Sequence, residues 1–160
     1  MAKPNQLPIK IRPANEEDVA FIFNSWLKSF RSSPFARVLS NEIYFAGHHK
    51  LIEKVLRRSQ VSVVCNVDDS SQIFGYSVTE RITGVLVIHY IYVKDSYRNM
   101  GIANTLLQNA GHDKRNFSCY THHTKPCDLI ASRYSLLYQP YAFFLEGETS
   151  DKSEPITAEN

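Results

Sequence analysis

Residues 92–107, YVKDSYRNMGIANTLL, place one arginine and one glycine between an apolar run and a helix-like run. A strand that turns into a helix leaves several backbone N–H groups unpaired, and such a turn attracts anions, phosphates above all. Gly101 has no Cβ to obstruct a phosphate, and Arg98 and Lys94 add positive charge. The stretch therefore predicts an anion site, although spacing alone leaves an ordinary turn glycine beside a solvated arginine equally open.

His89 is a second residue that could do chemistry, because it interrupts the apolar run 85–93. A histidine titrates near neutral pH and can accept a proton from a reacting group. Strand periodicity predicts that His89 shares a face with Ile91 and Val93. A core histidine bound to the backbone is the open alternative. Glu80, expected as the solvated end of the preceding strand, is a weaker candidate for the same role.

The elements that must position these residues can be read from periodicity and turn signals. Asn15 is expected to cap a first helix whose apolar face runs from Val19 to Phe30. The remaining pattern predicts one α/β domain over residues 1–146, a mixed sheet with helices on both faces. We expect strands at 8–12, 60–66, 73–80, 84–93, 117–122 and 141–146, and further helices at 41–58, 101–110 and 128–138.

Composition narrows the class of protein. The 160 residues are 43% hydrophobic and 21% charged, which is typical of a globular chain. Residues 1–145 hold seventeen basic and eleven acidic side chains, a moderate excess that suits an anionic ligand and does not indicate nucleic-acid binding. The acidic tail 147–160 is expected to be disordered. We expect no signal peptide and no membrane span, and three unpaired cysteines favour a reducing, cytoplasmic setting.

The segment Arg98–Ala103 resembles the Q/R-x-x-G-x-G/A motif of the GNAT acetyltransferase family, with alanine in the last position. Its flanks are similar as well: the strand end at 91–93 before it and Leu106-Leu107 after it. The order of expected elements over residues 8–146 is also that of a GNAT fold, β-α-α-β-β-β-α-β-α-β. The resemblance implies an enzyme that uses acetyl-CoA.

The resemblance also implies where the cofactor would bind. Its pyrophosphate would lie on the amides of the turn, and its pantetheine arm would pair with the edge of the preceding strand. A bulge in that strand would splay it from the next one and open the slot for the reaction. The implied cofactor-binding residues are Ile91, Tyr92 and Val93 for the arm, and Arg98, Asn99, Met100, Gly101, Ile102 and Ala103, with Asn104 as an added polar contact.

Two catalytic roles follow from the resemblance. His89 would be the base that takes a proton from the amine, directly or through water. The departing thiolate would take a proton from a tyrosine on the helix before the last strand. Residues 138–143, YQPYAF, are similar to the family pattern Y-x-x-x-G-F, which selects Tyr138 and leaves Tyr134 as the fallback.

The other histidines form two adjacent pairs, His48-His49 and His122-His123. Adjacent residues do not have metal-ligand spacing, so we predict no metal site. His122 or His123 could line the substrate slot, but a surface position is expected for both. Residues 26–45 correspond to the region that shapes the acceptor pocket in GNAT proteins, and they vaguely resemble small GNAT-like proteins of tailed phages.

The leading hypothesis is an N-acetyltransferase that moves an acetyl group from acetyl-CoA to a primary amine by direct transfer in a ternary complex. The expected acceptor is the amine of a small molecule or of a protein. We expect the protein to bind neither nucleic acid nor a membrane, and to be a monomer or a homodimer. The alternative is a catalytically inactive GNAT-fold binding or structural protein that keeps the CoA site. Modification of a nucleobase finds little support in the modest charge.

Overall fold

The computed structural model describes residues 7–144, which form one six-stranded sheet in the order β1-β2-β3-β4-β5-β6. The first four strands pair antiparallel, whereas β5 joins β4, and β6 joins β5, in parallel. The strands are β1 (Ile9–Pro13), β2 (Gln60–Asn66), β3 (Ile73–Ile82), β4 (Val85–Val93), β5 (Ser118–Tyr120) and β6 (Leu137–Tyr138). The helices are α1 (Val19–Arg31), α2 (Asn41–Arg58), α3 (Ile102–Asn109) and α4 (Lys125–Tyr134). The predicted mixed sheet with helices is confirmed.

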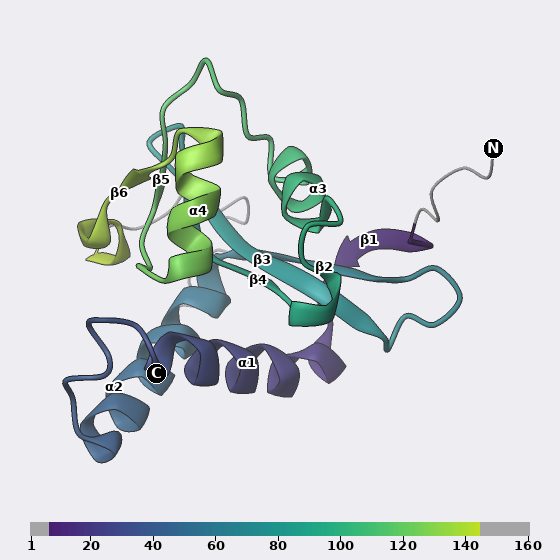
Figure 1. Cartoon of the computed structure of the whole chain (residues 1–160). Coiled ribbons are helices and arrows are strands. Elements are labelled where there is room, and N and C mark those ends of the chain that lie inside the picture. The colour runs from purple at the N-terminus through teal and green to yellow at the C-terminus, as the bar shows by residue number, and fades with distance from the viewer. Residues whose placement is uncertain (1–6, 145–160) are drawn as a thin grey trace, which may run out of the picture.

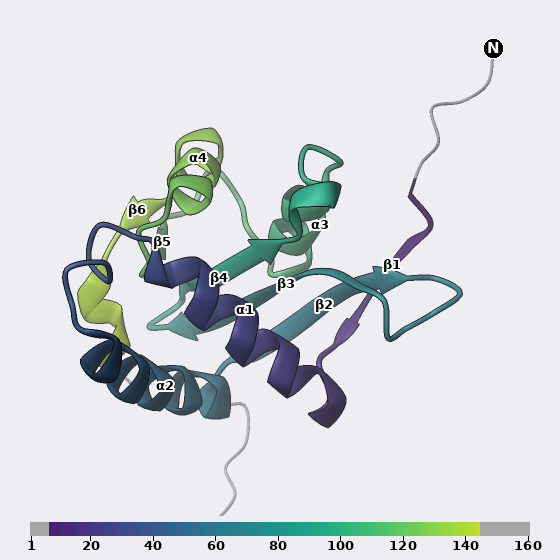
Figure 2. The same cartoon turned by 60° about the horizontal axis from the view of Figure 1, so that its bottom comes forward.

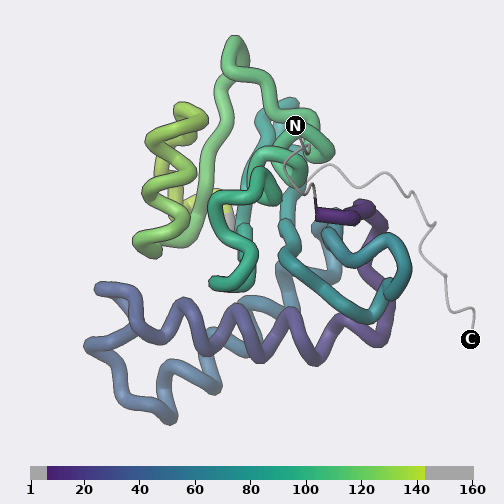
Figure 3. The backbone as a smooth tube through the Cα atoms, turned by 45° about the vertical axis from the view of Figure 1, so that its right-hand side comes forward, coloured from purple at the N-terminus to yellow at the C-terminus, as the bar shows by residue number. Residues whose placement is uncertain are grey.

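Two helices cover each face of the sheet. Figures 1 and 2 show α1 and α2 on one face and α3 and α4 on the other. The same division is visible in the side view of Figure 3. Successive side chains of a strand point to opposite faces of the sheet, so each strand contributes to the hydrophobic core on both faces. In β2, Val63 packs with α1 and α2, whereas Val64 packs with α3 and α4.

Side-chain caps set the starts of three helical segments. Asn15 forms a capping box with Asp18 at the turn that leads into α1, as the sequence predicts. Ser40 accepts a hydrogen bond from the amide of Ile43 at the start of α2, and Thr124 does the same for Cys127 at the start of α4.

The C-terminal part of the fold differs from the expectation. The helix predicted at 128–138 spans Lys125–Tyr134, because Ser135 adopts the left-handed conformation (φ 58°) and ends it. Tyr138 therefore lies in β6 and not on a helix. The last strand predicted at 141–146 is wrong for its described part, since Pro140–Phe144 forms a short 3-10 helix. The predicted tail 147–160 lies outside the described residues.

Within residues 7–144, every helix is too short or too polar to cross a membrane.

Candidate active site

A bulge in β4 divides the central strand pair. Val78 of β3 faces Tyr90 of β4, but the next residue, Thr79, faces Ile88, so His89 is an extra residue in β4. Pairing of β4 with β5 covers only Leu86–Ile88 and ends at this same point. Because a bulge bends the strand that carries it, the two parallel strands separate beyond Ile88. The result is a wedge between β4 and β5 that opens toward the C-terminal ends of both strands.

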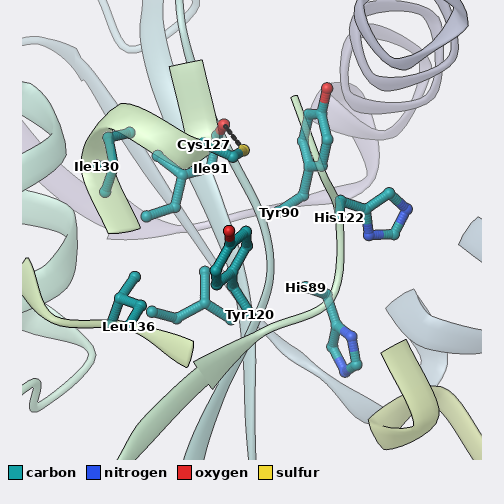
Figure 4. Close-up of a pocket in the computed structure, with 9 residues that line it drawn as sticks. His89, Tyr90, Ile91, Tyr120, His122, Cys127, Ile130 and Leu136 are labelled. Carbon is teal, nitrogen blue, oxygen red and sulfur yellow. Dashed lines mark hydrogen bonds between the residues drawn. The ribbon is translucent and has the colours of Figure 1, made fainter. Parts of the chain in front are cut away.

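The wedge passes through the sheet from one face to the other. On the α3/α4 side it is lined by Ile91, Cys127 and Ile130, and on the α1/α2 side by His89, Tyr90 and His122 (Figure 4). The enclosed volume is about 10 Å³, enough for a single water molecule. Cys127 narrows the α3/α4 side, since its Sγ lies 3.9 Å from the carbonyl oxygen of Ile91.

Backbone groups of β4 face this wedge. The amide of Lys94 donates to the carbonyl of Phe74 on β3, which fixes the alternation along the pair. In an antiparallel ladder, hydrogen-bonded residues alternate with residues whose groups point outward. Tyr92 therefore directs its N–H and C=O toward β3, and Ile91 and Val93 direct theirs toward the side that β5 has left. Two of the three expected strand residues thus present main-chain groups to the wedge.

The turn between β4 and α3 ends in an uncapped helix N-terminus. Gly101 (φ 82°) and Asn99 (φ 63°) both adopt the left-handed conformation, and no side chain caps α3. The first N–H groups of a helix have no intrahelical acceptor, so those of Ile102, Ala103 and Asn104 point out of its end. A Cβ built on Gly101 meets no heavy atom within 4 Å. The turn has the geometry and room for an anion that the sequence predicts.

The expected cations near this turn take up different positions. Arg98 forms an ion pair with Asp95 (2.8 Å) and donates to the carbonyl of Val93 (3.2 Å), so it braces the turn against β4. Lys94 instead packs its ammonium group over the ring of Phe21 on α1, 5.0 Å from the ring centre. Arg98 is the cation that remains part of the turn.

His89 lies on the opposite face from the one expected. The bulge places it with Tyr90 on the α1/α2 side, whereas Ile91 packs on the α3/α4 side, so the predicted shared face is wrong. Its side chain is 1% exposed, and its Nε2 lies 2.7 Å from Oε1 of Glu80. Glu80 is also buried, three per cent exposed at its side chain, and forms an ion pair with Arg58 (3.1 Å). The expectation of a solvated Glu80 at a strand end is therefore also wrong.

A continuous chain of polar contacts extends from His89 toward α2. Nδ1 of His89 lies 3.2 Å from the hydroxyl of Thr121, and that hydroxyl lies 3.1 Å from Nδ1 of His122. Nε2 of His122 lies 3.2 Å from Nε2 of His48. The expected surface position is wrong for His122, which is 2% exposed, and holds in part for His123, which is half-buried beside Asp128.

Burial governs the protonation of the three connected imidazoles. It lowers the pKa of His48 to about 4 and that of His122 well below its ordinary value. Burial also lowers the pKa of His89, although the hydrogen bond that its ring donates to Glu80 opposes this effect. All three rings are therefore neutral at pH 7, and each has one protonated and one basic nitrogen.

The comparisons with known proteins agree with this fold. Residues 19–134 match the family model described as the acetyltransferase (GNAT) family. The chain belongs to the GNAT acetyltransferase family. As a member it is an acyltransferase, of a family that uses acetyl-CoA. No curated protein matches the sequence.

Two solved structures illustrate the likeness. A proposed acetyltransferase from Pyrococcus furiosus has 21% identity and a TM-score of 0.58, over 78% of this chain and 91% of that one. A candidate acetyltransferase from Clostridium difficile 630 has 17% identity and a TM-score of 0.50, over 91% and 95% of the two chains. At these identities the likeness shows the fold.

The two candidate tyrosines of this GNAT chain lie in different surroundings. Tyr134 ends α4, and its hydroxyl donates to Oδ1 of Asn104 on α3 (3.2 Å). Tyr138 lies in β6 with its ring against that of His123, 4.0 Å between centres. Burial and the nearby Asp128 raise the pKa of Tyr138. Only Tyr134 is on the helix before the last strand.

A larger pocket adjoins the outer end of the histidine chain. It has a volume of about 260 Å³ and lies between the end of α1, the following loop and α2. We call it the aromatic pocket; its walls are Phe30, Phe35, Ala36, Leu39, Ile43, Tyr44, Gly47, His48 and Leu51. His48 thus lies between the aromatic pocket and His122 of the wedge.

Several residues of this GNAT site were not found from the sequence. Gly75 of β3 is one, because a Cβ there would lie 2.5 Å from the carbonyl oxygen of Tyr92 and 3.2 Å from Ile102. A glycine within a strand signals such a close approach and could have revealed it. Arg58 and His48 on α2 and Thr121 after β5 are others, and these two parts of the fold are distant in the chain. No local pattern marks them.

Proposed function

We propose that this protein transfers an acetyl group from acetyl-CoA to a primary amine, with donor and acceptor meeting in the wedge between β4 and β5. The observation that carries the proposal is the end of β4–β5 pairing at Ile88, one residue before the bulge at His89. This arrangement gives the donor and the acceptor separate faces of one sheet. Direct transfer in a ternary complex suits two routes that meet at one opening.

The turn before α3 and the edge of β4 fit the donor. The amides from Arg98 to Ala103, with Asn99 and Met100 between them, would hold the pyrophosphate, and Asn104 would add a polar contact. Outward main-chain groups of Ile91 and Val93 would pair with the pantetheine arm as an added strand does. Acetyl-CoA supplies a thioester carbonyl that an amine can attack. Cys127 must withdraw from Ile91 to admit the arm, and main-chain amides at the bulge would stabilise the oxyanion.

His89 and Glu80 would act together as the base. Glu80 holds the proton on Nε2, which leaves Nδ1 of His89 as the basic nitrogen, directed at Thr121 beside the wedge. The proton can reach Nδ1 through the Thr121 hydroxyl. Tyr134 is the tyrosine that we assign to protonation of the thiolate, in preference to Tyr138, because it lies on the helix that borders the donor side.

The aromatic pocket would bind the body of the acceptor. It is the larger space on the α1/α2 side, and its walls carry no acidic residue. A polycationic amine would find no counter-charge there, whereas an apolar or aromatic body would contact rings such as Phe30 and Tyr44. The proposed acceptor class is therefore a primary amine attached to an apolar group.

Two measurements test this function. Acetyl-CoA should raise the melting temperature, because a ligand at a hundredfold excess over its Kd stabilises the native state by about 2.7 kcal/mol. Thiol release should then follow addition of 2-phenylethylamine and be weaker with spermidine. Absence of a thermal shift at millimolar acetyl-CoA would contradict the donor site. A shift without turnover on any amine would favour the inactive binding protein.

A further inference from the structure

The contacts that link the five polar groups from Glu80 to His48 can all be made at once in only one direction when Glu80 is a carboxylate. The carbonyl oxygen of His89, 3.3 Å from the Thr121 hydroxyl, is a competing acceptor for the proton of that hydroxyl. A carboxylate accepts and cannot donate, so Nε2 of His89, which lies 2.7 Å from Oε1 of Glu80, must carry a proton. Because a neutral imidazole carries one proton, Nδ1 of His89 must accept, and the Thr121 hydroxyl donates to it.

The same rule continues along the chain. The Thr121 oxygen then accepts from Nδ1 of His122, which leaves Nε2 of His122 as an acceptor. Nε2 of His48 must donate to it. Every proton in this series of contacts points toward Glu80. Nδ1 of His48 is left as the basic nitrogen at the outer end, and His48 is one of the residues that line the aromatic pocket.

We propose that Glu80, His89, Thr121, His122 and His48 form a proton relay, in which His48 takes the proton of the acceptor ammonium and Glu80 is protonated at the other end. The inference rests on the proposed function, since it assumes an amine in the aromatic pocket. It goes beyond that function because it assigns the amine-facing step to His48. His89 and Glu80 remain the inner end of the base, and the proton of the amine reaches them through His48, His122 and Thr121.

Burial explains why a relay is needed here. Nε2 of His89 lies within hydrogen-bond distance of Glu80, Nδ1 lies within hydrogen-bond distance of Thr121, and the residue is 1% exposed. An amine in the aromatic pocket therefore cannot contact His89 directly. His48 is the member of the chain that lines that pocket. It stacks on Phe30 and Tyr44, with ring centres 4.7 and 5.4 Å away. These contacts hold its ring plane while protons shift.

The transfer balances in protons and bonds. The ammonium loses one proton to Nδ1 of His48, and four successive shifts along His122, Thr121 and His89 leave Glu80 protonated. The neutral amine then forms the C–N bond as the C–S bond breaks. Tyr134 gives its proton to the thiolate to form the free thiol, and the second proton of the amine replaces the proton that Tyr134 has lost. When the amide product leaves, the relay returns its proton to solvent through His48.

Charged and titratable neighbours set the resting direction of these hydrogen bonds. Arg58 pairs with Glu80 at the inner end and favours its carboxylate form, which can only accept. At the outer end Tyr44 of α2 faces His48, and the guanidinium of Arg31 lies over the Tyr44 ring, 5.0 Å from its centre. Tyr90 faces His122 from β4. Burial raises the pKa of Tyr44 to about 12 and that of Tyr90 further, so neither phenol competes for the proton.

The hydrogen-bond direction can be tested without any turnover. Long-range ¹H–¹⁵N correlation spectra of the full chain with ¹⁵N-labelled histidine report which ring nitrogen carries the proton. The relay requires protonated Nε2 in His89, protonated Nδ1 in His122 and protonated Nε2 in His48. A proton on Nδ1 of His48 would remove the basic outer nitrogen and overturn the proposal.

The role of His48 in acetyl transfer is tested with the variant His48→Gln. The matched control is His49→Gln, because His49 is the exposed neighbour of His48 and takes no part in the relay. With 2-phenylethylamine, kcat/KM at pH 7 should fall by about 10²-fold or more in His48→Gln and by less than about twofold in the control. The acetyl-CoA thermal shift should persist in both. Imidazole added to His48→Ala should restore part of the rate, because it fills the vacated site with a titrating ring.

The outcomes separate the relay from the function on which it rests. Normal kcat/KM in His48→Gln, or a loss in His48→Ala that imidazole does not restore, would overturn the relay and leave acetyl transfer standing. A wild-type protein that acetylates no amine would overturn both, whatever the tautomers are.

Discussion

On the α3/α4 side of the wedge, the groups proposed to bind the donor belong to the main chain, whereas on the α1/α2 side the groups proposed to move a proton are buried side chains. Ile91, Val93 and the turn through Gly101 depend on backbone conformation, and many side-chain changes would leave them intact. Glu80, His89 and His48 depend on side-chain identity at positions contributed by β3, β4 and α2. The donor side should therefore fail through backbone or steric changes, and the acceptor side through single side-chain changes.

The largest effect is expected from Gly101→Glu, which places a carboxylate at the anion turn. It should abolish the acetyl-CoA thermal shift, because the carboxylate repels the pyrophosphate and occupies its space. Left-handed backbone strain of about 1–2 kcal/mol accompanies the change. Gly84→Glu is the matched control, since Gly84 has φ 78° and equally open surroundings in the β3–β4 turn. Retained acetyl-CoA binding in Gly101→Glu would place the phosphate site elsewhere.

The next effect is expected from His89→Gln, which keeps a polar side chain and removes the titrating ring. Acetyl-CoA binding should persist, and kcat should fall by about 10²–10⁴-fold, the usual range for loss of a general base. The deficit should shrink above about pH 9, where the amine needs less help to lose its proton. The measurement is a kcat profile from pH 6 to 10 beside the thermal shift.

The opposing result for His89 is also specific. Early melting with normal turnover per folded molecule would make His89 a structural core residue. His89 would then no longer be an example of a proton-moving side chain on the α1/α2 side of the wedge.

A smaller effect separates the two tyrosines. Tyr134→Phe should lower kcat by about 10–100-fold, since the thiolate would lose a positioned acid. Tyr138→Phe should change kcat by less than about threefold, because its ring packs on His123 away from α3. Steady-state thiol release at saturating acetyl-CoA decides between them. Equal losses, or a larger loss for Tyr138→Phe, would reverse the assignment.

The local structure of the proposed donor side could be predicted from the sequence because its signals are local. A strand, a glycine turn and a helix follow one another within residues 91–104, and the structure places them so. The acceptor side could not be predicted in this way. The bulge at His89 reverses the face expected from strand alternation, and a single extra residue is enough to do that.

Burial also changed the interpretation of several polar residues. Glu80 and His122 are polar residues near expected strand ends, a pattern typical of exposed positions. Both are nevertheless buried, Glu80 beside Arg58 of α2 and His122 beside Trp26 of α1. Only the packing of helices onto the sheet shows that they are enclosed. The last elements were misplaced for a local reason, because the left-handed Ser135 gave no glycine signal to end the helix.

The smallest effect concerns stability and pH, and it tests whether His48 is held neutral in the folded state. Burial lowers its pKa from 6.5 to about 4, so the unfolded chain binds the proton more tightly. Stability is then complete above pH 6.5 and is lost as the pH falls toward 4. Between pH 7 and 5 the loss from His48 amounts to about 2 kcal/mol, or roughly 4–8 °C in melting temperature for a chain of this size.

This contribution of His48 to the free energy of unfolding can be measured by urea unfolding at pH 7 and pH 5. The proteins to compare are the wild type, His48→Gln and His49→Gln. His48→Gln removes the titrating group, so its stability should fall by about 2 kcal/mol less than that of the wild type over this interval. His49→Gln should follow the wild type. Since His122 and His89 also have lowered pKa values, a residual loss with the same sign should remain in His48→Gln. An identical pH dependence in the wild type and His48→Gln would mean that His48 titrates as an exposed histidine does. Its ring would then be charged in much of the folded protein at pH 6, and the outer nitrogen of the relay would already hold the proton that it is proposed to take.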